Sequence, residues 1–309
     1  MANLSLRKKR LYKKNRIYTK NRLAAYGFLA PTFILFSFIF IVPIFFVVGS
    51  SFVSWNLLNP GAGIRFIGFQ NYLSLLRDPH VWNSFINTFV FTIFSVPISM
   101  GIGLGLALAV ETLGRSRKMI EALLLLPMMV SPIAIFLSFR FMFEPSFGTV
   151  NKFLALFGIQ GPGWFSSMET AMMSVIIVDI WRVSPFVFIV TYAALKMLSR
   201  EPVEAAKVDG ANAIQSFRFV VMPLIKPALL VILIVRIMDA IRAFDNILML
   251  TRGGPANSTR TIQFISYELS FEALNMGRGS AMAVLIVLVI IIVGYALIHA
   301  MNRINDEIV

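Results

Sequence analysis

The chain has 309 residues, of which 58% are hydrophobic and 14% charged, and its mean hydropathy is +0.79. Soluble globular domains have about a quarter charged residues, so these values indicate a protein that folds in lipid. The net charge of +13 does not indicate nucleic-acid binding, because nine of the 28 basic residues lie in the first 22 and no stretch interleaves basic with aromatic residues. The absence of cysteine excludes disulfides and thiolate metal sites.

The hydropathy pattern predicts an all-α integral membrane protein with six transmembrane helices. A spanning helix needs about 20 mainly apolar residues, and such windows lie at 24–52, 84–110, 122–143, 170–195, 222–250 and 279–302. They form a predicted transmembrane domain over 23–302, with a basic tail at 1–22 and a short tail at 303–309. Prolines inside the windows predict kinks rather than breaks, since neighbouring helices can satisfy the freed carbonyls.

The distribution of basic residues predicts the orientation. The segments on the N-terminal side of the membrane contain seventeen Lys and Arg, whereas those on the opposite side contain six. Because cytoplasmic segments hold the excess of these residues, we expect both termini in the cytoplasm. The first apolar window is too long for a signal peptide, so the basic tail is expected to lie beside anionic lipid headgroups and to precede a retained helix.

The longest predicted cytoplasmic loop, 196–221, contains the most informative motif. Its sequence from Glu201 predicts two short helices joined at Gly210, since Pro202 suits a first helical turn and glycine permits a sharp reversal. The stretch resembles the signature of ABC-importer permease subunits, which consists of Glu-Ala-Ala, three residues, Gly, nine residues, and a final four-residue segment that ends in Pro. The resemblance implies the type I ABC importer permease fold and a coupling helix that docks on an ATPase subunit. The residues carried over are Glu204, Ala205, Ala206, Asp209, Gly210, Ala211 and Pro223.

Further segments narrow the resemblance to carbohydrate importers. FQNY at 69–72, DPHVW at 78–82, NTFVF at 87–91 and FDNILMLTRGGP at 244–255 are similar to the first permease subunit of maltose-type and glycerol-3-phosphate-type systems. The resemblance covers most of the chain beyond residue 22 and implies a location in the bacterial inner membrane. It also implies a second homologous permease as heterodimer partner, two cytoplasmic ATPase subunits, an extracytoplasmic solute-binding protein and a saccharide substrate.

The chain itself is not expected to be an enzyme. It has no phosphate-binding loop of the G-x-x-x-x-G-K-[ST] type, so ATP and Mg are expected in the partner ATPase. The two histidines, His80 and His299, lie on opposite sides of the predicted membrane and cannot form a metal-ligand cluster. No cofactor is therefore expected in this chain.

Charged residues inside the predicted spans form a candidate substrate path. The charges of the fifth span alternate in sign every three residues. The simpler interpretation is that they neutralise one another along one helix. The alternative is that they hydrogen-bond a sugar while an aromatic face stacks on its ring. The resembling maltose-type subunit has a Trp at the matching position but neutral polar residues in the fifth span, so an acidic saccharide is our hypothesis. The residues are Trp181, Arg182, Arg236, Asp239, Arg242 and Asp245.

Three other functions remain open from the sequence. An ion-driven secondary transporter would show inverted repeats and broken midplane helices, and it would leave the motif at 201–223 unexplained. A membrane enzyme would use the intramembrane Asp and Arg residues in catalysis. An ABC permease for amino acids or inorganic ions would share the loop motif and should lack the segment Thr251–Pro255. The segment 201–223 could also be a connector between two spans with no docking role.

Overall fold

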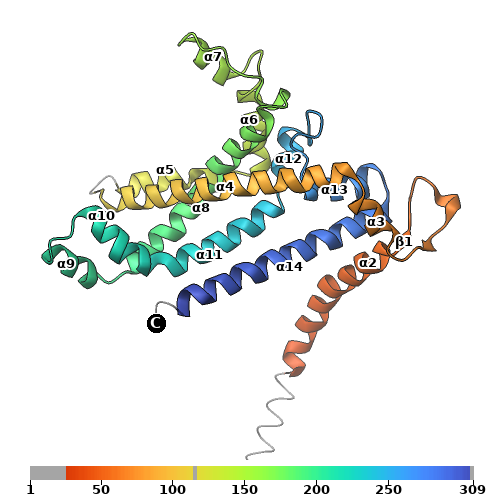
Figure 1. The fold of residues 1–309 in the computed structure, drawn as a ribbon, viewed down its shortest axis with the longest axis horizontal. Coiled ribbons are helices and arrows are strands. Elements are labelled where there is room, and N and C mark those ends of the chain that lie inside the picture. The colour runs from red at the N-terminus through yellow and green to blue at the C-terminus, as the bar shows by residue number, and fades with distance from the viewer. Residues whose placement is uncertain (1–25, 114–116, 307–309) are drawn as a thin grey trace, which may run out of the picture.

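The computed structural model describes residues 26–113 and 117–306, and it is mainly helical (Figure 1). In the described residues, the helices long and apolar enough to cross a membrane are Tyr26–Ser51, α4 (Pro79–Glu111), α8 (Ala171–Met197), Ala213–Ile241 and α14 (Met276–Asp306). Two shorter helices, α5 (Arg117–Met129) and α6 (Pro132–Met142), pass the same test together and supply a sixth, bent span. The predicted helical membrane fold is thus confirmed.

Two of the long helices contain wider turns. The first includes a π-helical turn, η1 (Ser37–Ile41), followed by α2 (Val42–Ser51). The helix Ala213–Ile241 consists of α10 (Ala213–Ser216), a π-helical turn η4 (Phe217–Val221) and α11 (Met222–Ile241). Such turns occur mostly as single insertions in α-helices, often near functional sites.

Short elements lie at the two ends of the bundle. At one end α9 (Glu201–Val208) and α10 project beyond the long helices, and the last described residues of α14 reach the same end (Figure 1). The connections away from that end contain β1 (Val53–Ser54), η2 (Pro60–Ala62), β2 (Arg65–Phe66), α3 (Gln70–Leu76), α7 (Thr149–Ala155), η3 (Trp164–Ser166), α12 (Asp245–Leu250), α13 (Ile262–Tyr267) and η5 (Glu268–Glu272). The strands β1 and β2 pair antiparallel, with Val53 opposite Phe66.

The third predicted span, 122–143, was wrong as a continuous helix. The chain turns by 93° between Met129 and Pro132, so that α6 runs away from the bundle toward α7 (Figure 1). Ser131 has extended backbone angles of φ −55° and ψ 132°. A residue before proline is sterically disfavoured in the α region, and this is the physical reason for a break where a kink was expected.

The fifth predicted span, 222–250, was also wrong as one helix. The helix α11 ends at Ile241, and a new helix, α12, begins at Asp245. The carbonyl of Ala243, freed by the break, accepts a hydrogen bond of 2.9 Å from the buried hydroxyl of Thr261. A break at this depth is stable because a neighbouring segment satisfies the backbone that the helix no longer pairs.

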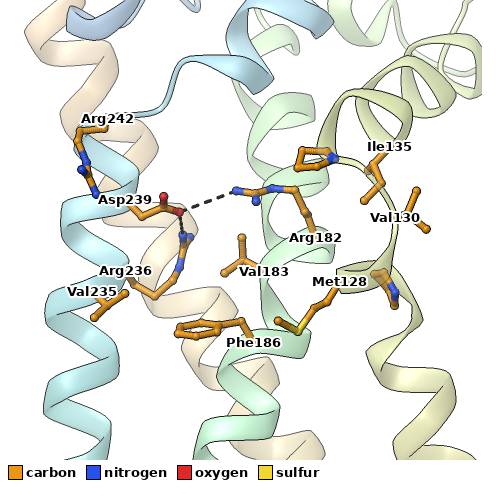
Figure 2. A pocket seen from close by; sticks show the side chains of 12 residues that line it. Met128, Val130, Ile135, Arg182, Val183, Phe186, Val235, Arg236, Asp239 and Arg242 are labelled. Carbon is orange, nitrogen blue, oxygen red and sulfur yellow. Dashed lines mark hydrogen bonds and ion pairs between the residues drawn. The ribbon is translucent and has the colours of Figure 1, made fainter. Parts of the chain in front are cut away.

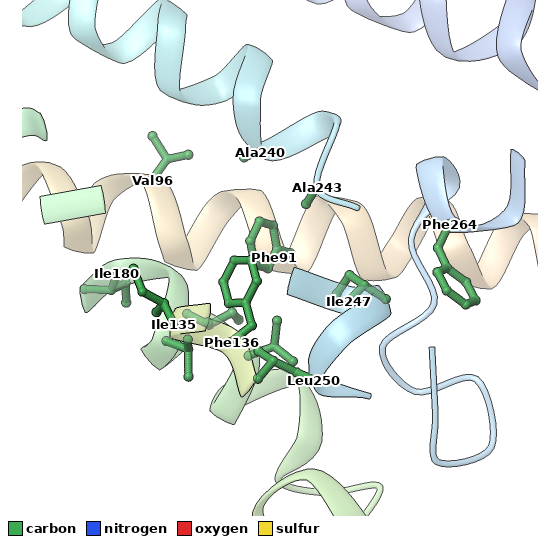
Figure 3. Close-up of a cluster of buried hydrophobic side chains, with 13 residues drawn as sticks. Phe91, Val96, Ile135, Phe136, Ile180, Ala240, Ala243, Ile247, Leu250 and Phe264 are labelled. Atoms are coloured by element: carbon green, nitrogen blue, oxygen red, sulfur yellow. The ribbon is translucent and has the colours of Figure 1, made fainter. Parts of the chain in front are cut away.

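The pair α4 and α8 forms the centre of the bundle. Along α4 about half of the buried positions are Ser, Gly or Ala, and a Cβ added to Gly103 would lie 2.5 Å from the Cβ of Val187 in α8. Small residues of this kind let membrane helices approach closely. Beside this pair, Phe91, Phe136, Ile247 and Leu250 belong to an apolar cluster shared by α4, α6, α8 and α12 (Figure 3). This cluster fixes the broken ends of α6 and α11 against the bundle.

Candidate functional site

Four charged side chains from α8 and α11 form a connected network inside the bundle, which we call the ion quartet: Asp179, Arg182, Arg236 and Asp239. Arg236 Nη2 donates to Asp179 Oδ2 at 2.9 Å, and its Nη1 donates to Asp239 Oδ2 at 3.0 Å. Arg182 Nη2 donates to Asp179 Oδ1 at 3.1 Å. The same nitrogen lies 3.8 Å from Asp239 Oδ2, and Figure 2 shows Arg182 and Arg236 meeting at this carboxylate. The quartet is formally neutral, which limits the cost of charges at membrane depth.

The quartet has a buried side and an open side. Asp179 and Arg236 are only 2% and 1% exposed, and the hydroxyl of Ser95 on α4 donates to Asp179 Oδ2 at 2.5 Å. The side chain of Asp239, by contrast, is 52% exposed. Three helices are therefore tied together on the buried side, while Asp239 and part of Arg182 remain accessible.

Sequence reasoning missed Asp179 and Ser95 as members of this site. Asp179 is not among the predicted path residues, although its spacing of three residues from Arg182 is a signal for an ion pair on one helix. For Ser95 the sequence offered no comparable signal. Its position opposite Asp179 depends on how α4 and α8 pack, which helical spacing on one chain segment does not specify.

The charges that alternate along the fifth span, which we call the charge ladder, form only the first of the ion pairs expected along one helix. Arg236 pairs with Asp239, but Arg242 lies beyond the end of α11, where its Nε donates to the carbonyl of Met238 at 3.2 Å. Asp245 is in the first turn of the separate helix α12. Mutual neutralisation thus accounts for part of the predicted path and leaves Arg242 outside the quartet.

Two adjoining cavities lie along the open side of the quartet. The larger has a volume of about 350 Å³ and lies between the α5–α6 bend, α8 and α11 (Figure 2). The smaller, of about 110 Å³, reaches the break between α11 and α12 and includes Asp245. Pro132, Arg182, Asp239 and Arg242 line both. Both helix breaks thus border one space inside the membrane domain, which apolar and charged side chains line together.

Trp181 lies outside both cavities. Its ring packs edge-on against Phe139 of α6, with the centroids 5.0 Å apart, and the side chain is 46% exposed. The structure therefore brings five of the six predicted path residues to the cavities and places Trp181 on the flank of α8 that faces α6.

The predicted loop motif folds as an elbow, residues 201–216. Pro202 is the second residue of α9, Gly210 has φ +84°, and Asn212 and Gln215 form a reciprocal capping box at the start of α10. Glycine suits this reversal because a positive φ is strained in residues with a Cβ. Glu204, Ala205, Asp209 and Gly210 are exposed, Ala206 and Ala211 are half-buried, and Pro223 is exposed in the first turn of α11.

Two apolar side chains of the elbow were not anticipated from the sequence. Val208 is 87% exposed and Ile214 is 77% exposed, and they flank the turn at Gly210. These two side chains are exposed on a polar loop beyond the bundle end and are thus available for contact with another protein.

The segment Thr251–Pro255 forms a tightly bonded loop between α12 and α13. The hydroxyls of Thr251 and Thr259 lie 2.7 Å apart, and Thr259 also donates to the carbonyl of Gly254 at 2.9 Å. Asn87 of α4 donates to the carbonyl oxygens of Asn257 and Arg260. The loop is thereby held against α4, close to the second helix break.

Comparison with known proteins places this architecture in a family. The model of the family described as "Binding-protein-dependent transport system inner membrane component" matches residues 99–306. The chain belongs to this family. The matched region includes the elbow, both helix breaks and all four members of the ion quartet.

Curated relatives of this family are similar over most of the chain. The sulfoquinovosyl glycerol transport system permease protein SmoG of Agrobacterium fabrum is 35% identical over 256 residues, which is 83% of each chain. The trehalose/maltose transport system permease protein MalF of Thermococcus litoralis is 31% identical over 71% of this chain and 74% of its own. The sn-glycerol-3-phosphate permease protein UgpA of Escherichia coli O157:H7 is 30% identical over 82% of this chain and 87% of its own.

The fold is also found among solved structures. A chain from the structure of a bacterial ABC transporter involved in the import of the acidic polysaccharide alginate aligns with a TM-score of 0.82 at 23% identity, over 96% of this chain and 99% of that one. The predicted type I ABC importer permease fold is thus confirmed. As a binding-protein-dependent inner membrane component, the chain is a permease of an ABC transporter.

Proposed function

We propose that this chain is one permease subunit of an ATP-driven importer that takes a sugar or oligosaccharide from a solute-binding protein. The observation that carries the proposal is the elbow at 201–216, whose exposed Val208 and Ile214 lie beyond the bundle end and suit a protein interface. The saccharide is supported by the relatives, whose printed names include trehalose, maltose, sulfoquinovosyl glycerol and starch degradation products.

The proposed assembly contains a second homologous permease, two cytoplasmic ATPase subunits and an extracytoplasmic binding protein. In it, the elbow end of the bundle and both termini face the cytoplasm, consistent with the excess of basic residues on that side. ATP and Mg belong to the ATPase subunits, and this chain converts the movement of those subunits into exposure of its path.

The elbow is connected directly to the cavity wall. From Ala213 to Ile241 the chain is one helix of 29 residues, interrupted only by the π-helical turn η4. A displacement of α10 is therefore transmitted along α11 to Arg236 and Asp239, which line the larger cavity. In the proposed cycle, closure of the ATPase dimer tilts α11 against α8 and alternately opens the path to each side, a rigid-body transition.

Substrate contacts are proposed for the open side of the quartet. Arg182, Asp239, Arg242 and Asp245 offer charged hydrogen-bonding groups at the cavities, whereas the buried pair of Asp179 and Arg236 has a structural role. Trp181 lies on the flank of α8, outside both cavities. It would contact the sugar only if the second permease extended the path to that flank.

The proposal is tested with the complex purified through this subunit and reconstituted in proteoliposomes. We expect ATPase subunits to co-purify and ATP-dependent uptake of a saccharide supplied by the co-purified binding protein. The double variant Val208→Asp and Ile214→Asp should lose the ATPase subunits, because two carboxylates would be buried in the interface. Ile64→Asp, at an exposed site between η2 and β2, is the matched control and should retain them. Retention of the ATPase by the double variant would contradict the assignment of the elbow.

A further inference from the structure

The larger cavity has more positive charge than its walls neutralise. Arg182, Arg236 and Arg242 line it with Asp239, and Asp179 pairs with both Arg182 and Arg236 from behind the wall, so Arg242 leaves a formal charge of +1. The smaller cavity is lined by three aspartates and two arginines, and its formal charge is zero once Arg236, which pairs with two of those aspartates, is included. Since the sign of the local potential selects the charge of an occupant, the larger cavity favours an anion.

Arg242 is the arginine available to that anion. Arg182 and Arg236 are each held by the carboxylates of the ion quartet. The side chain of Arg242 is exposed, its Nε donates to the carbonyl of Met238, and it forms no ion pair with any residue in 26–113 or 117–301, whose side chains the structure describes. A guanidinium group binds carboxylates and similar acids through two parallel N–H donors, and here the terminal nitrogens are free to do so among the described residues.

The other two arginines offer an occupant less. The Nε atoms of Arg182 and Arg236 are buried without a hydrogen-bond partner among the described residues, and an atom inside the cavity cannot reach them. The exposed guanidinium group of Arg242 therefore presents the accessible donors, and it matches a negatively charged occupant rich in oxygen acceptors.

We propose that the larger cavity is the anion-binding part of the substrate path and that Arg242 determines specificity by binding the acid group of an acidic saccharide. This inference rests on the proposed function. It also narrows the sequence hypothesis, which placed Arg182, Arg236 and Arg242 together in the path of an acidic saccharide. The quartet instead positions the cavity wall, and the residue left outside it recognises the ligand.

The sign of the cavity potential can be measured without knowing the sugar. The chain has no cysteine, so Val235→Cys, at an exposed position of the cavity wall, introduces one thiol into this subunit. In the assembled transporter without ATP, its labelling is compared for an anionic sulfonatoethyl and a cationic trimethylammonium-ethyl methanethiosulfonate, each corrected for its rate with a free thiol. We expect the anionic reagent to react faster, and Arg242→Gln to lower the ratio about fivefold.

Matched variants and saccharides complete the test. Arg242→Lys should keep the ratio, and Arg65→Gln, which removes an exposed charge on β2, should leave it unchanged. A disaccharide containing glucuronate should slow labelling more than its carboxyl-reduced form, and Arg242→Gln should abolish that difference. A ratio of one, insensitivity to Arg242→Gln, or equal protection by both saccharides would each overturn the inference. If the unsubstituted complex showed no ATP-driven saccharide uptake while the labelling ratio behaved as expected, the proposed function alone would be refuted.

Discussion

Replacing Asp179 by asparagine tests whether the ion quartet holds the bundle together. The carboxylate is 2% exposed and receives hydrogen bonds from Ser95, Arg182 and Arg236. Asp179→Asn leaves two guanidinium groups to share one carboxylate. Breaking a buried ion pair costs about 3–5 kcal/mol. Arg236 keeps its 3.0 Å bond to Asp239, so we expect the lower end of that range.

The assay is thermal unfolding of the purified complex, read on this subunit. At about 2 °C per kcal/mol for a chain of this size, a loss of about 3 kcal/mol lowers the Tm by about 6 °C. Asp239→Asn is the matched control in the same network. Its carboxylate is 52% exposed, and a loss of at most about 1 kcal/mol is expected.

A double variant distinguishes a charge effect from a packing effect. When Arg236→Gln is combined with Asp179→Asn, the buried charge that lost its partner is also removed, so part of the stability should return. The reasoning would be refuted if Asp179→Asn and Asp239→Asn lowered the Tm equally, or if the double variant lost the full sum of the two single changes.

Three further substitutions test other parts of the structure. Gly210→Ala forces an L-residue into a positive φ at the elbow at a cost of about 1–2 kcal/mol, and we expect weaker stimulation of ATP hydrolysis by the loaded binding protein at unchanged complex yield. Gly103→Val should lower the Tm by overpacking α4 against α8, about 1–3 kcal/mol, whereas Gly101→Val, with open space around its Cβ, should not. Thr261→Val removes the donor to the carbonyl at the α11 break and should cost about 1–3 kcal/mol, measured by the same unfolding assay.

Hydropathy alone predicted the helical membrane fold, because about 20 apolar residues in lipid have few alternatives to a helix. The elbow was predictable for a related reason: Pro202 and Gly210 restrict their own backbone angles locally. Asp179 was not recognised as part of the site, since its partners Ser95 and Arg236 come from other helices. Trp181 was assigned to the path by resemblance, and its place beside α6 depends on the bend at Pro132.

The two spans that were predicted incorrectly have a common cause. A mainly apolar length is evidence that a segment can cross the membrane as a helix, but it contains no information on where the helix is interrupted. Irregular backbone at membrane depth is tolerated where it is buried in protein or borders a polar space. Val130 and Pro132 at the first break, and Arg242 at the second, all line the larger cavity. Both breaks therefore lie where α5–α6 and α11 face the same space.

This coincidence gives the breaks a functional interpretation. A straight helix through Arg242 would continue the charge ladder of α11, and the guanidinium group would lie within reach of Asp239 and Asp245 on one helix surface. Ending α11 at Ile241 moves Arg242 out of that series and leaves it exposed at the junction of the two cavities. The departure from regular helix thus creates the one cavity-lining arginine that is free of a carboxylate partner among the described residues.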